Sequence, residues 1–421
     1  MRRRAVVIGG GFGGLRVAQR LARYADHEAL DVVLIDQSPY HCLRPKLPQA
    51  LGARIACAVH VPLSALLASS RVRLLTKQVT GIDPAAHRIS WEDGALEADV
   101  LVLALGGEPC IPPGMAEDPS VLLPVWGFDQ TCGIRRRVRF LTDAARRGRA
   151  VNLDVVVIGG GFVGVEVAAE LQGRLTRISH GDRRASVTLV EAQERVLPRL
   201  SAWAGRAAAR RLAAGGVHLS LGTEVLHVRA GGVALADGRR LDAGTVIWAG
   251  GRIQAPGLAA TSGLVDETGR IPVMDTLAMA RDADIFALGD CAYSVERGAD
   301  ASEPSAHRAE AQADIVAQNV LARLRHRPLI PYRPGPNIYV MGLGPRYGIL
   351  EVERLRTAGL APALFKELVI LRHLLEAGGV AALRGAASRV VLDELQPARW
   401  DSPPLPEGVV HATQVSGRHG E

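Results

Sequence analysis

The 421-residue sequence predicts an α/β fold in which one strand–turn–helix unit occurs twice. Segments 6–21 (VVIGGGFGGLRVAQRL) and 156–171 (VVIGGGFVGVEVAAEL) are identical at 11 of 16 positions. Each copy is an apolar run, a glycine-rich turn and a helical pattern, and a further apolar run ending in an acidic residue follows it. This order is typical of a Rossmann-like domain with a parallel sheet, so the chain is expected to contain two of them.

The first glycine turn has the spacing that binds a pyrophosphate. We expect Gly9 to permit the tight bend, Gly11 to let the backbone approach the ligand and Gly14 to let helix and strand pack closely. The run DVVLID ends at Asp36, 27 residues after Gly9, where a carboxylate can accept hydrogen bonds from both ribose hydroxyls. The first unit is therefore predicted to bind a dinucleotide.

The second turn repeats this logic with Gly159, Gly161 and Gly164. Its following run, ASVTLVE, ends at Glu191, 32 residues after Gly159. A carboxylate in this place binds the unphosphorylated ribose of NADH and repels the 2′-phosphate of NADPH. We therefore expect a preference for NADH, which the nearby Arg195 could weaken.

A motif that follows the second unit in the sequence is predicted to belong to the first unit. Each unit is closed by an apolar strand with a small-residue turn, in ADVLVLALGGEP and AGTVIWAGGRI, and DADIFALGDCAY then delivers Asp290 beside Gly289, where it can bind a ribityl hydroxyl. We therefore expect an NADH-binding domain inserted into an FAD-binding domain. The predicted boundaries are 1–115 and 271–335 for the FAD domain, 116–270 for the NAD(P)H domain, 336–396 for a C-terminal α/β extension and 397–421 for a tail.

Charge and cysteine spacing exclude several classes of function. The formal net charge of +7 suits dinucleotides or an anionic membrane surface, and no lysine run or aromatic platform indicates nucleic acid. The five cysteines lack C-x-x-C spacing, which argues against a metal site or dithiol redox pair and favours reduced thiols in the cytoplasm. With no run of eighteen apolar residues, we expect a cytoplasmic protein or one held peripherally on the inner membrane face.

Six motifs together resemble the two-dinucleotide-binding-domain flavoproteins, the pyridine nucleotide-disulfide oxidoreductase superfamily. They are GGGFGG, YHCLRPKLPQAL, LVLALG, GGGFVGVEVAAEL, VIWAGG and FALGDCA. Within the superfamily, residues 4–345 are most similar to type II NADH:quinone oxidoreductases. The resemblance implies an enzyme with non-covalent FAD that takes hydride from NADH and passes two electrons to a quinone or quinone-like acceptor. The missing cysteine pair argues against the disulfide reductases and the sulfide:quinone enzymes.

The resemblance also implies roles for the residues that distinguish the two copies. Glu166 and Glu170 share a helix face at i and i+4, where the first copy has Arg16 and Arg20. Glu166 is expected to be catalytic, between the nicotinamide and the flavin. The two arginines are expected to face ordinary surface.

The helix after the Gly289–Asp290 turn is expected to begin near Ser305, with its N-terminus directed at the reduced flavin. His307 is a candidate proton donor to the acceptor, with Gln312 lining the same pocket. Type II enzymes start this helix with Ala-Gln-x-Ala-x-Gln-Gln, whereas this chain reads AHRAEAQ. That departure leaves open a soluble FAD/NAD(P)H-dependent reductase with a non-quinone substrate. The remaining candidate cofactor-binding residues are Phe12, Gly13, Lys46, Val79, Ala104, Gly106, Gly250 and Ala306.

Segment 361–375, APALFKELVILRHLL, predicts an amphipathic helix. Core packing, a homodimer contact and docking on a membrane surface all fit its stripe. The proline-rich end of the chain, from Gln396, is expected to be extended or disordered. The predicted apolar stripe consists of Leu364, Phe365, Leu368, Leu371, Leu374 and Leu375.

Overall fold

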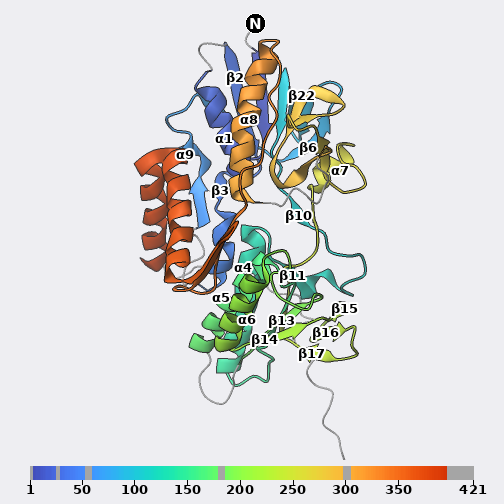
Figure 1. Cartoon of the computed structure of the whole chain (residues 1–421), viewed down its shortest axis with the longest axis vertical. Coiled ribbons are helices and arrows are strands. Elements are labelled where there is room, and N and C mark those ends of the chain that lie inside the picture. The colour runs from blue at the N-terminus through green and yellow to red at the C-terminus, as the bar shows by residue number, and fades with distance from the viewer. Residues whose placement is uncertain (1–2, 25–28, 53–58, 179–184, 297–304, 396–421) are drawn as a thin grey trace, which may run out of the picture.

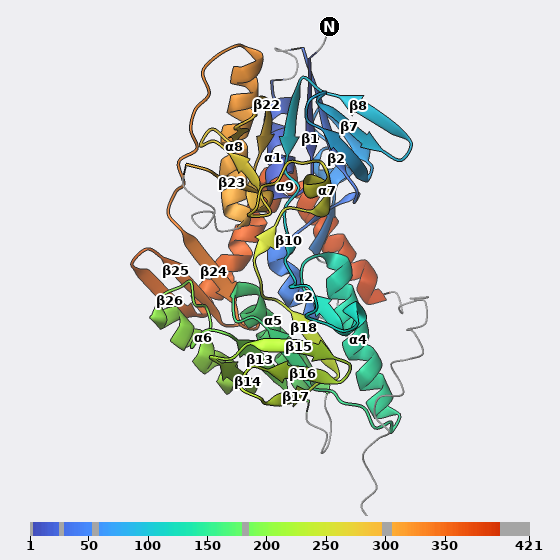
Figure 2. The same ribbon diagram turned by 90° about the vertical axis from the view of Figure 1, so that its right-hand side faces the viewer.

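The chain forms an upper and a lower α/β unit, with a helix and a small sheet along one side (Figure 1). Turning the molecule by 90° shows the crossing β10 between the two units (Figure 2). The tail predicted from Gln396 lies outside the described residues. This computed structural model describes residues 3–24, 29–52, 59–178, 185–296 and 305–395.

The upper sheet has the strand order β23-β20-β21-β22-β9-β1-β2-β5. Its centre is parallel, because β1 pairs in parallel with β2 and β9, and β9 pairs in parallel with β22. The apolar runs predicted to be buried strands are buried in the core. The bounds are β1 (Arg3–Ile8), β2 (Leu30–Asp36), β5 (Val72–Thr76), β9 (Val100–Leu103), β20 (Ile271–Val273), β21 (Ala278–Met279), β22 (Asp282–Ala287) and β23 (Ala292–Ser294).

Two long helices, α1 (Phe12–Ala22) and α8 (Ala306–Leu324), pack against each other beside this sheet (Figure 1). Helix α1 follows the first glycine turn directly and buries Leu15, Ala18 and Leu21, as its spacing predicted. Helix α8 begins where expected, since the Ser305 hydroxyl accepts a hydrogen bond from the Arg308 amide and so caps the helix.

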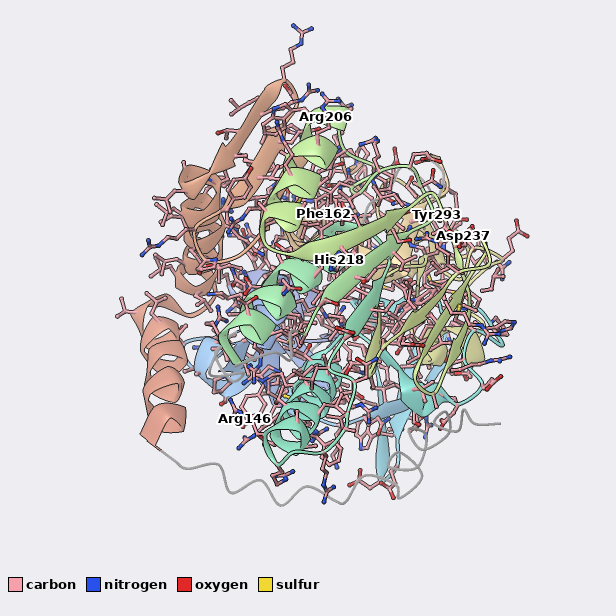
Figure 3. The ribbon with its side chains drawn as sticks, turned by 90° about the horizontal axis from the view of Figure 1, so that it is seen from below. Arg146, Phe162, Arg206, His218, Asp237 and Tyr293 are labelled. Atoms are coloured by element: carbon pink, nitrogen blue, oxygen red, sulfur yellow. The ribbon has the colours of Figure 1, made fainter. Side chains whose placement is uncertain are left out.

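The lower sheet is entirely parallel, in the order β11-β18-β12-β13-β14. Its strands lie in the sequence between β9 and β20 of the upper sheet, so this unit is an insertion. Figure 3 shows it from below, with Phe162 labelled at the start of α5 and Arg206 on α6. The bounds are β11 (Leu122–Pro124), α4 (Phe128–Arg146), β12 (Val155–Ile158), α5 (Phe162–Ile178), β13 (Val187–Glu191), α6 (Ala202–Ala214), β14 (Val217–Leu221) and β18 (Thr245–Trp248).

Short elements complete the two units. A two-stranded antiparallel ribbon of β10 (Glu108–Pro109) and β19 (Ile253–Gln254) forms where the chain passes between them. The others are β3 (Tyr40–Cys42), η1 (Arg44–Lys46), α2 (Leu47–Gly52), β4 (His60–Pro62), α3 (Leu63–Leu66), β6 (Val79–Asp83), β7 (Arg88–Trp91), β8 (Gly94–Glu97), η3 (Pro119–Val121), β15 (Val225–Arg229), β16 (Gly232–Leu235), β17 (Arg240–Asp242), α7 (Gly257–Thr261) and η4 (Gly289–Cys291).

The C-terminal extension is a three-stranded antiparallel sheet followed by a long helix. The strands are β24 (Ile338–Gly342), β25 (Gly348–Val352) and β26 (Leu355–Gly359), and the helix is α9 (Leu360–Leu395). Helix α9 is kinked at Gly379, whose φ of +60° is in the left-handed region. It packs on β24, β25 and α3, so it contacts both the small sheet of the extension and the upper unit.

The predicted apolar stripe on α9 is correct except at one position. Leu364, Leu368, Leu371 and Leu375 are between 40% and 59% exposed, and Phe365 is 38% exposed. The placement of Leu374 in the same stripe is wrong, because this residue is 6% exposed and packs in the core of the upper unit. Since the other five are exposed, core packing does not explain the stripe. Among the described helices, none is long and apolar enough to cross a membrane.

Candidate functional site

The first glycine turn has the geometry of an anion cradle. Gly9 has a φ of +105°, which allows the tight bend, and a Cβ at Gly14 would overlap the Gly9 carbonyl oxygen. The position where Gly11 lacks a Cβ has no atom within 4 Å, so its backbone is open to a ligand. Helix α1 starts at once with Phe12, so its free N–H groups point toward that opening.

Asp36 lies at the end of β2 beside this turn. Its Oδ2 accepts a hydrogen bond from the Gly10 amide at 2.5 Å, and its Oδ1 accepts one from the Ser38 amide at 2.7 Å. Burial raises the pKa of this carboxyl group, while the two backbone donors and Arg44 oppose that rise. The carboxylate is thus held at the edge of the cradle, and ribose binding by it stays a prediction.

Arg44 is a functional candidate that the sequence reasoning missed. Burial raises the pKa values of both Asp36 and Asp290, and the positive charge of Arg44 opposes that rise in each. Its guanidinium lies 5.0 Å from the centre of the Trp126 ring. It also lies against Gly106, where an added Cβ would be 3.3 Å from its Nη2 atom. Arg44 lies in the LRPK segment, two residues before the predicted candidate Lys46.

Gly289 and Asp290 form the short helix η4 at the end of β22. The Gly289 amide donates a hydrogen bond to Gln312 Oε1 at 2.7 Å, and Arg270 Nε donates to the Asp290 carbonyl at 3.1 Å. Burial raises the pKa of the Asp290 carboxyl group, and Arg44 and Arg270 oppose the rise. Gln312 was expected to line an acceptor pocket, but it is 9% exposed and instead positions the Gly289 turn.

The second glycine turn has the same backbone geometry as the first. Gly159 has a φ of +104°, a Cβ at Gly164 would overlap the Gly159 carbonyl oxygen, and the Gly161 position is open. Glu191 at the end of β13 accepts hydrogen bonds from the Gly160 amide at 2.6 Å and the Gln193 amide at 2.9 Å. Glu191 therefore occupies the position that Asp36 has in the first unit.

Arg195, which was considered as a residue that could weaken the preference for NADH, is directed at a loop. Its guanidinium donates hydrogen bonds to four backbone carbonyls of the following loop, those of Leu197, Pro198, Leu200 and Ser201. These bonds use the donors that a 2′-phosphate would need. Arg195 is therefore a loop-stabilising residue.

A cavity of about 1130 Å³ lies between the lower unit, the start of α8 and helix α9. From the lower unit it is lined by Gly159, Gly161, Glu191 and Gly250. From the other side it is lined by Phe12, Ala306, His307, Glu310, Phe365, Lys366, Val369, Ile370 and His373. One space thus connects the second glycine turn with the apolar side chains of α9.

His307 and Ala306 lie in the first turn of α8 and line this cavity. His307 is exposed, so its imidazole is open to a ligand from the cavity. Lys46, a candidate cofactor-binding residue, forms an ion pair with Glu367 on α9. Its ammonium donates to Glu367 Oε2 at 2.7 Å, and Gln49 donates to the other oxygen of Glu367 at 3.1 Å.

Glu166 is buried behind the cavity wall. Its Oε1 accepts hydrogen bonds from the Gly342 amide at 2.6 Å and from the Lys366 ammonium, which itself lines the cavity. Glu166 is not among the residues found to line the cavity and contacts it only through Lys366. Its expected place between the nicotinamide and the flavin stays a prediction. Burial, followed by the charge of Glu166, raises the pKa of Glu170 to about 7. The sequence reasoning missed Lys366, because it lies 200 residues from Glu166.

The remaining candidates lie around the first turn. Ala104 donates its amide to the Ile8 carbonyl at 2.9 Å, and its own carbonyl is close to where a Cβ would stand at Gly9. Gly13 packs with its Cα beside Leu288 and Ala309. Val79 begins β6 and pairs with Trp91. These positions bring Ala104 and Gly13 to the turn; contact with a cofactor remains a prediction for all three.

The expectation that Arg16 and Arg20 face ordinary surface is wrong. Arg16 donates to both oxygens of Asp314 on α8 and to Glu376 on α9, and Arg20 also donates to Asp314. The hydrogen bond with Asp314 contributes most to raising the pKa of Arg16. The two arginines therefore connect α1 to α8 and α9, which the sequence of α1 alone could not reveal.

The sequence reasoning also missed a buried chain of polar side chains. His41 Nδ1 lies 2.9 Å from the Gly10 carbonyl oxygen, and its Nε2 lies 3.0 Å from Nε2 of His373. His373 Nδ1 lies 2.6 Å from Glu310 Oε1. The Phe12 ring packs against both imidazoles, with centroid distances of 4.9 and 4.3 Å.

The cysteines give no sign of a redox pair within the described residues. Cys42, Cys110, Cys132 and Cys291 are free thiols. Burial raises the pKa of Cys42 to about 11 and that of Cys291 to about 12, so these two remain protonated at neutral pH. The described residues also contain no cluster of histidine, cysteine or carboxylate groups able to hold a metal ion.

Comparison with known proteins agrees with this geometry. The family model described as pyridine nucleotide-disulphide oxidoreductase matches residues 3–313. A type II NADH:quinone oxidoreductase of Staphylococcus saprophyticus is 25% identical over 90% of this chain and 97% of its own, and an NADH dehydrogenase-like protein of Mycobacterium tuberculosis is 31% identical over 81% and 86%. The structure of NDH2 from Plasmodium falciparum in complex with NADH has a similar fold, with a TM-score of 0.78, 16% identity and coverage of 92% and 98%.

Proposed function

The chain belongs to the pyridine nucleotide-disulphide oxidoreductase family, and from this premise we propose that it oxidises NADH with FAD and passes two electrons to a quinone. The cavity carries this proposal, because it joins the second glycine turn to the apolar side chains of α9 in one space. An NADH-binding side and an apolar acceptor side therefore open onto the same chamber. Hydride transfer needs the two reacting rings in contact more than it needs acid–base groups.

The first unit fits FAD. The open backbone at Gly11 and the N-terminus of α1 suit a pyrophosphate, Asp36 suits the ribose and Asp290 suits the ribityl chain. Arg44, whose charge acts on both carboxyl groups, would balance the phosphate charge. When bound, FAD accepts a hydride at its isoalloxazine ring and delivers two electrons to an acceptor.

The second unit fits NADH rather than NADPH. Glu191 accepts two backbone hydrogen bonds and presents its carboxylate to the cavity, where it would bind the ribose hydroxyls. A 2′-phosphate placed there would meet a negative charge, and both terminal nitrogens of Arg195 are bonded to loop carbonyls. The donor preference follows from this local electrostatics.

The acceptor side is apolar with a few polar groups, which suits a quinone ring. Phe365, Val369 and Ile370 supply the apolar wall, and Lys366 and His307 supply hydrogen-bond donors for the quinone oxygens. Relatives over most of the chain are named for NADH and quinone chemistry. The quinone is therefore the acceptor class that this wall and these donors favour.

Contact with a membrane surface belongs to the same proposal. Leu364 and Leu368 are 55% and 59% exposed on α9, next to side chains that line the cavity. An apolar helix face at the mouth of a quinone site lets a lipid-soluble acceptor enter without crossing water. Flotation with anionic phospholipid vesicles tests this. The Leu364→Asp/Leu368→Asp variant should lose binding, whereas Leu226→Asp, at a 51% exposed site on the lower unit, should keep it. A dimer that the double variant abolishes, with no vesicle binding, would contradict membrane contact.

Steady-state turnover tests the proposed function as a whole. The purified protein should be yellow, retain FAD, and oxidise NADH with ubiquinone-1 while forming one quinol per NADH. Turnover of NADH with ferricyanide but with no quinone would contradict the assignment and favour a reductase with another acceptor.

A further inference from the structure

We infer that Glu310 and His373 form a proton-transfer pair, which carries a proton from a pocket at the protein surface to the quinone in the cavity. This inference rests on the proposed quinone reductase activity and adds the route of the proton that the reaction consumes. The two residues lie on α8 and α9, outside both glycine turns.

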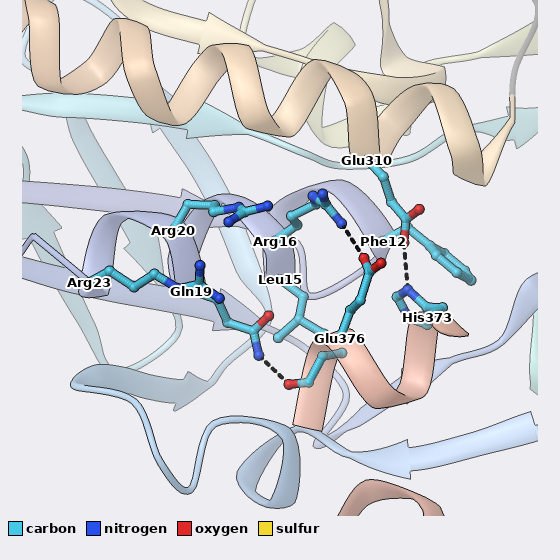
Figure 4. Close-up of a pocket in the computed structure, with 10 residues that line it drawn as sticks. Phe12, Leu15, Arg16, Gln19, Arg20, Arg23, Glu310, His373 and Glu376 are labelled. Carbon is cyan, nitrogen blue, oxygen red and sulfur yellow. Dashed lines mark hydrogen bonds and ion pairs between the residues drawn. The ribbon is translucent and has the colours of Figure 1, made fainter. Parts of the chain in front are cut away.

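The pair lies between two spaces. A smaller pocket of about 200 Å³ is formed by α1, α8 and α9, and Figure 4 shows it with Glu310 and His373 on one side. Its other lining residues include Arg23 and Glu376, which are exposed, so this pocket reaches solvent. Glu310 and His373 also line the large cavity. The two residues thus face solvent on one side and the proposed acceptor space on the other.

The available donors and acceptors determine the direction of each hydrogen bond from Gly10 through His41 and His373 to Glu310. Burial, together with the neighbouring His373, lowers the pKa of His41 to about 3, so His41 is a neutral imidazole. Because the Gly10 carbonyl can only accept, His41 carries its hydrogen on Nδ1 and accepts at Nε2. His373 must then carry a hydrogen on Nε2 to donate to His41. What remains is the contact between His373 Nδ1 and Glu310.

That last contact must contain one proton in either charge state. If Glu310 is ionised, His373 is an imidazolium that donates from Nδ1; if Glu310 is protonated, its hydroxyl donates to a neutral His373. Both states have the same number of protons and zero net charge. The side chains are 8% and 13% exposed, so a shared proton is held there with little solvent competition. The pair is therefore loaded with one transferable proton.

The overall reaction requires such a proton. NADH, one solvent proton and a quinone give NAD⁺ and a quinol. The C4–H bond of the nicotinamide breaks, two O–H bonds of the quinol form, and the quinone gains the two electrons. One of the quinol hydrogens thus comes from solvent. We assign its delivery to this pair: the proton shared by His373 Nδ1 and Glu310 passes to a quinone oxygen in the cavity, and a proton from the surface pocket replaces it.

The surrounding charges support a neutral pair that exchanges protons with solvent. Arg16 lies close enough to Glu310 to interact with it, and it is itself bound by Asp314 and Glu376. The Phe12 ring packs against both imidazoles. The hydrogen-bonded side chains of His41, His373 and Glu310 have several charged or titratable neighbours. These are Arg16 on α1, Arg44 on η1, His60 on β4, and Arg372 and Glu376 on α9.

The test compares an acceptor that needs protons with one that does not. His373→Gln and Glu310→Gln in the FAD-loaded full-length protein should lower kcat with ubiquinone-1 by about 10- to 100-fold. Turnover with ferricyanide, which takes electrons alone, should change less than about twofold because it needs no general acid. The loss with ubiquinone-1 should also grow with pH, since solvent must then supply the proton directly.

Asp314→Asn is the matched control. It lies one helical turn after Glu310 on α8 and loses ion pairs with Arg16 and Arg20, but it lines neither space. It should leave turnover with both acceptors unchanged. Equal losses with ubiquinone-1 and ferricyanide in the two test variants, or no loss with either, would overturn the inference.

A measurement on the wild-type protein keeps the inference testable if a variant fails to retain FAD. Turnover with ubiquinone-1 should be slower in D₂O than in H₂O, and turnover with ferricyanide should not. The same ratio with both acceptors would overturn the proton route. Failure of the proposed function has a different signature, namely a wild-type protein that reduces ferricyanide and no quinone.

Discussion

Lys366 on α9 and Glu166 on α5 form a buried ion pair that connects the C-terminal extension to the inserted unit. Their side chains are 6% and 10% exposed. Glu166 also accepts the Gly342 amide, so its carboxylate is bonded to β24 and α9 at once. Because Lys366 lines the cavity, the position of a cavity wall depends on a residue of α5.

Removing one member of this pair should cost much more than removing both. Lys366→Met leaves a buried carboxylate without its cation, and we expect a loss of roughly 3–5 kcal/mol in the free energy of unfolding. The Glu166→Gln/Lys366→Met double variant should recover most of that loss, as measured by urea unfolding. Lys46→Met is the control, since its partner Glu367 is 46% exposed and the loss should be below about 1 kcal/mol. Additive losses in the double variant would contradict the coupling.

Asp36→Ala should weaken FAD binding by about 10- to 100-fold, because it removes a ribose acceptor and leaves the Gly10 and Ser38 amides unpaired. The dissociation constant can be measured from flavin fluorescence on titration of the apoprotein. Asp99→Ala is the matched control, since Asp99 accepts a backbone amide at the opposite end of β1. Equal affinity in the Asp36 and Asp99 variants would contradict the role of Asp36.

Glu191→Ala should narrow the preference for NADH over NADPH by about tenfold, or about 1.4 kcal/mol, because the charge facing the 2′-phosphate is removed. The ratio of kcat/KM for the two donors measures this. Glu194→Ala removes an exposed carboxylate three residues later and should leave the ratio unchanged. A wild-type preference for NADPH would show that Glu191 has been assigned wrongly.

Glu170 should make stability fall between about pH 4.5 and pH 7. Its pKa is raised to about 7, mainly by burial, so the folded protein holds a proton there that the unfolded chain has released. Its contribution is complete below the unfolded pKa and is lost as the pH rises through the folded one. Glu170→Gln should therefore raise stability above pH 7 by roughly 1–3 kcal/mol and flatten the slope. Glu92→Gln, at an exposed site, should change neither; an unaltered slope in Glu170→Gln would contradict the assignment.

The sequence was sufficient for features set by neighbouring residues. The bends at Gly9 and Gly159, the acidic ends of β2 and β13, and the start of α8 at Ser305 depend on backbone sterics and capping within one strand–turn–helix unit. Such units have recognisable spacing, so their positions were predictable.

Features formed between distant elements were not predictable in the same way. The bond from Lys366 to Glu166 spans 200 residues, and the contact between His41 and His373 spans 332. Both depend on how α9 packs against the two units, which no local pattern encodes. The same cause explains the wrong expectations for Arg16 and for Leu374. Arg16 is bonded to carboxylates on α8 and α9, and Leu374 packs into the core of the upper unit.

Anaerobic stopped-flow absorbance of the flavin tests the central claim most directly. One equivalent of NADH should bleach the flavin of the wild-type protein, and one equivalent of ubiquinone-1 should then restore its full absorbance. His307→Ala should slow the second step and leave the first nearly unchanged, because His307 lines the acceptor side of the cavity. A flavin that NADH reduces but that no quinone reoxidises would contradict the account.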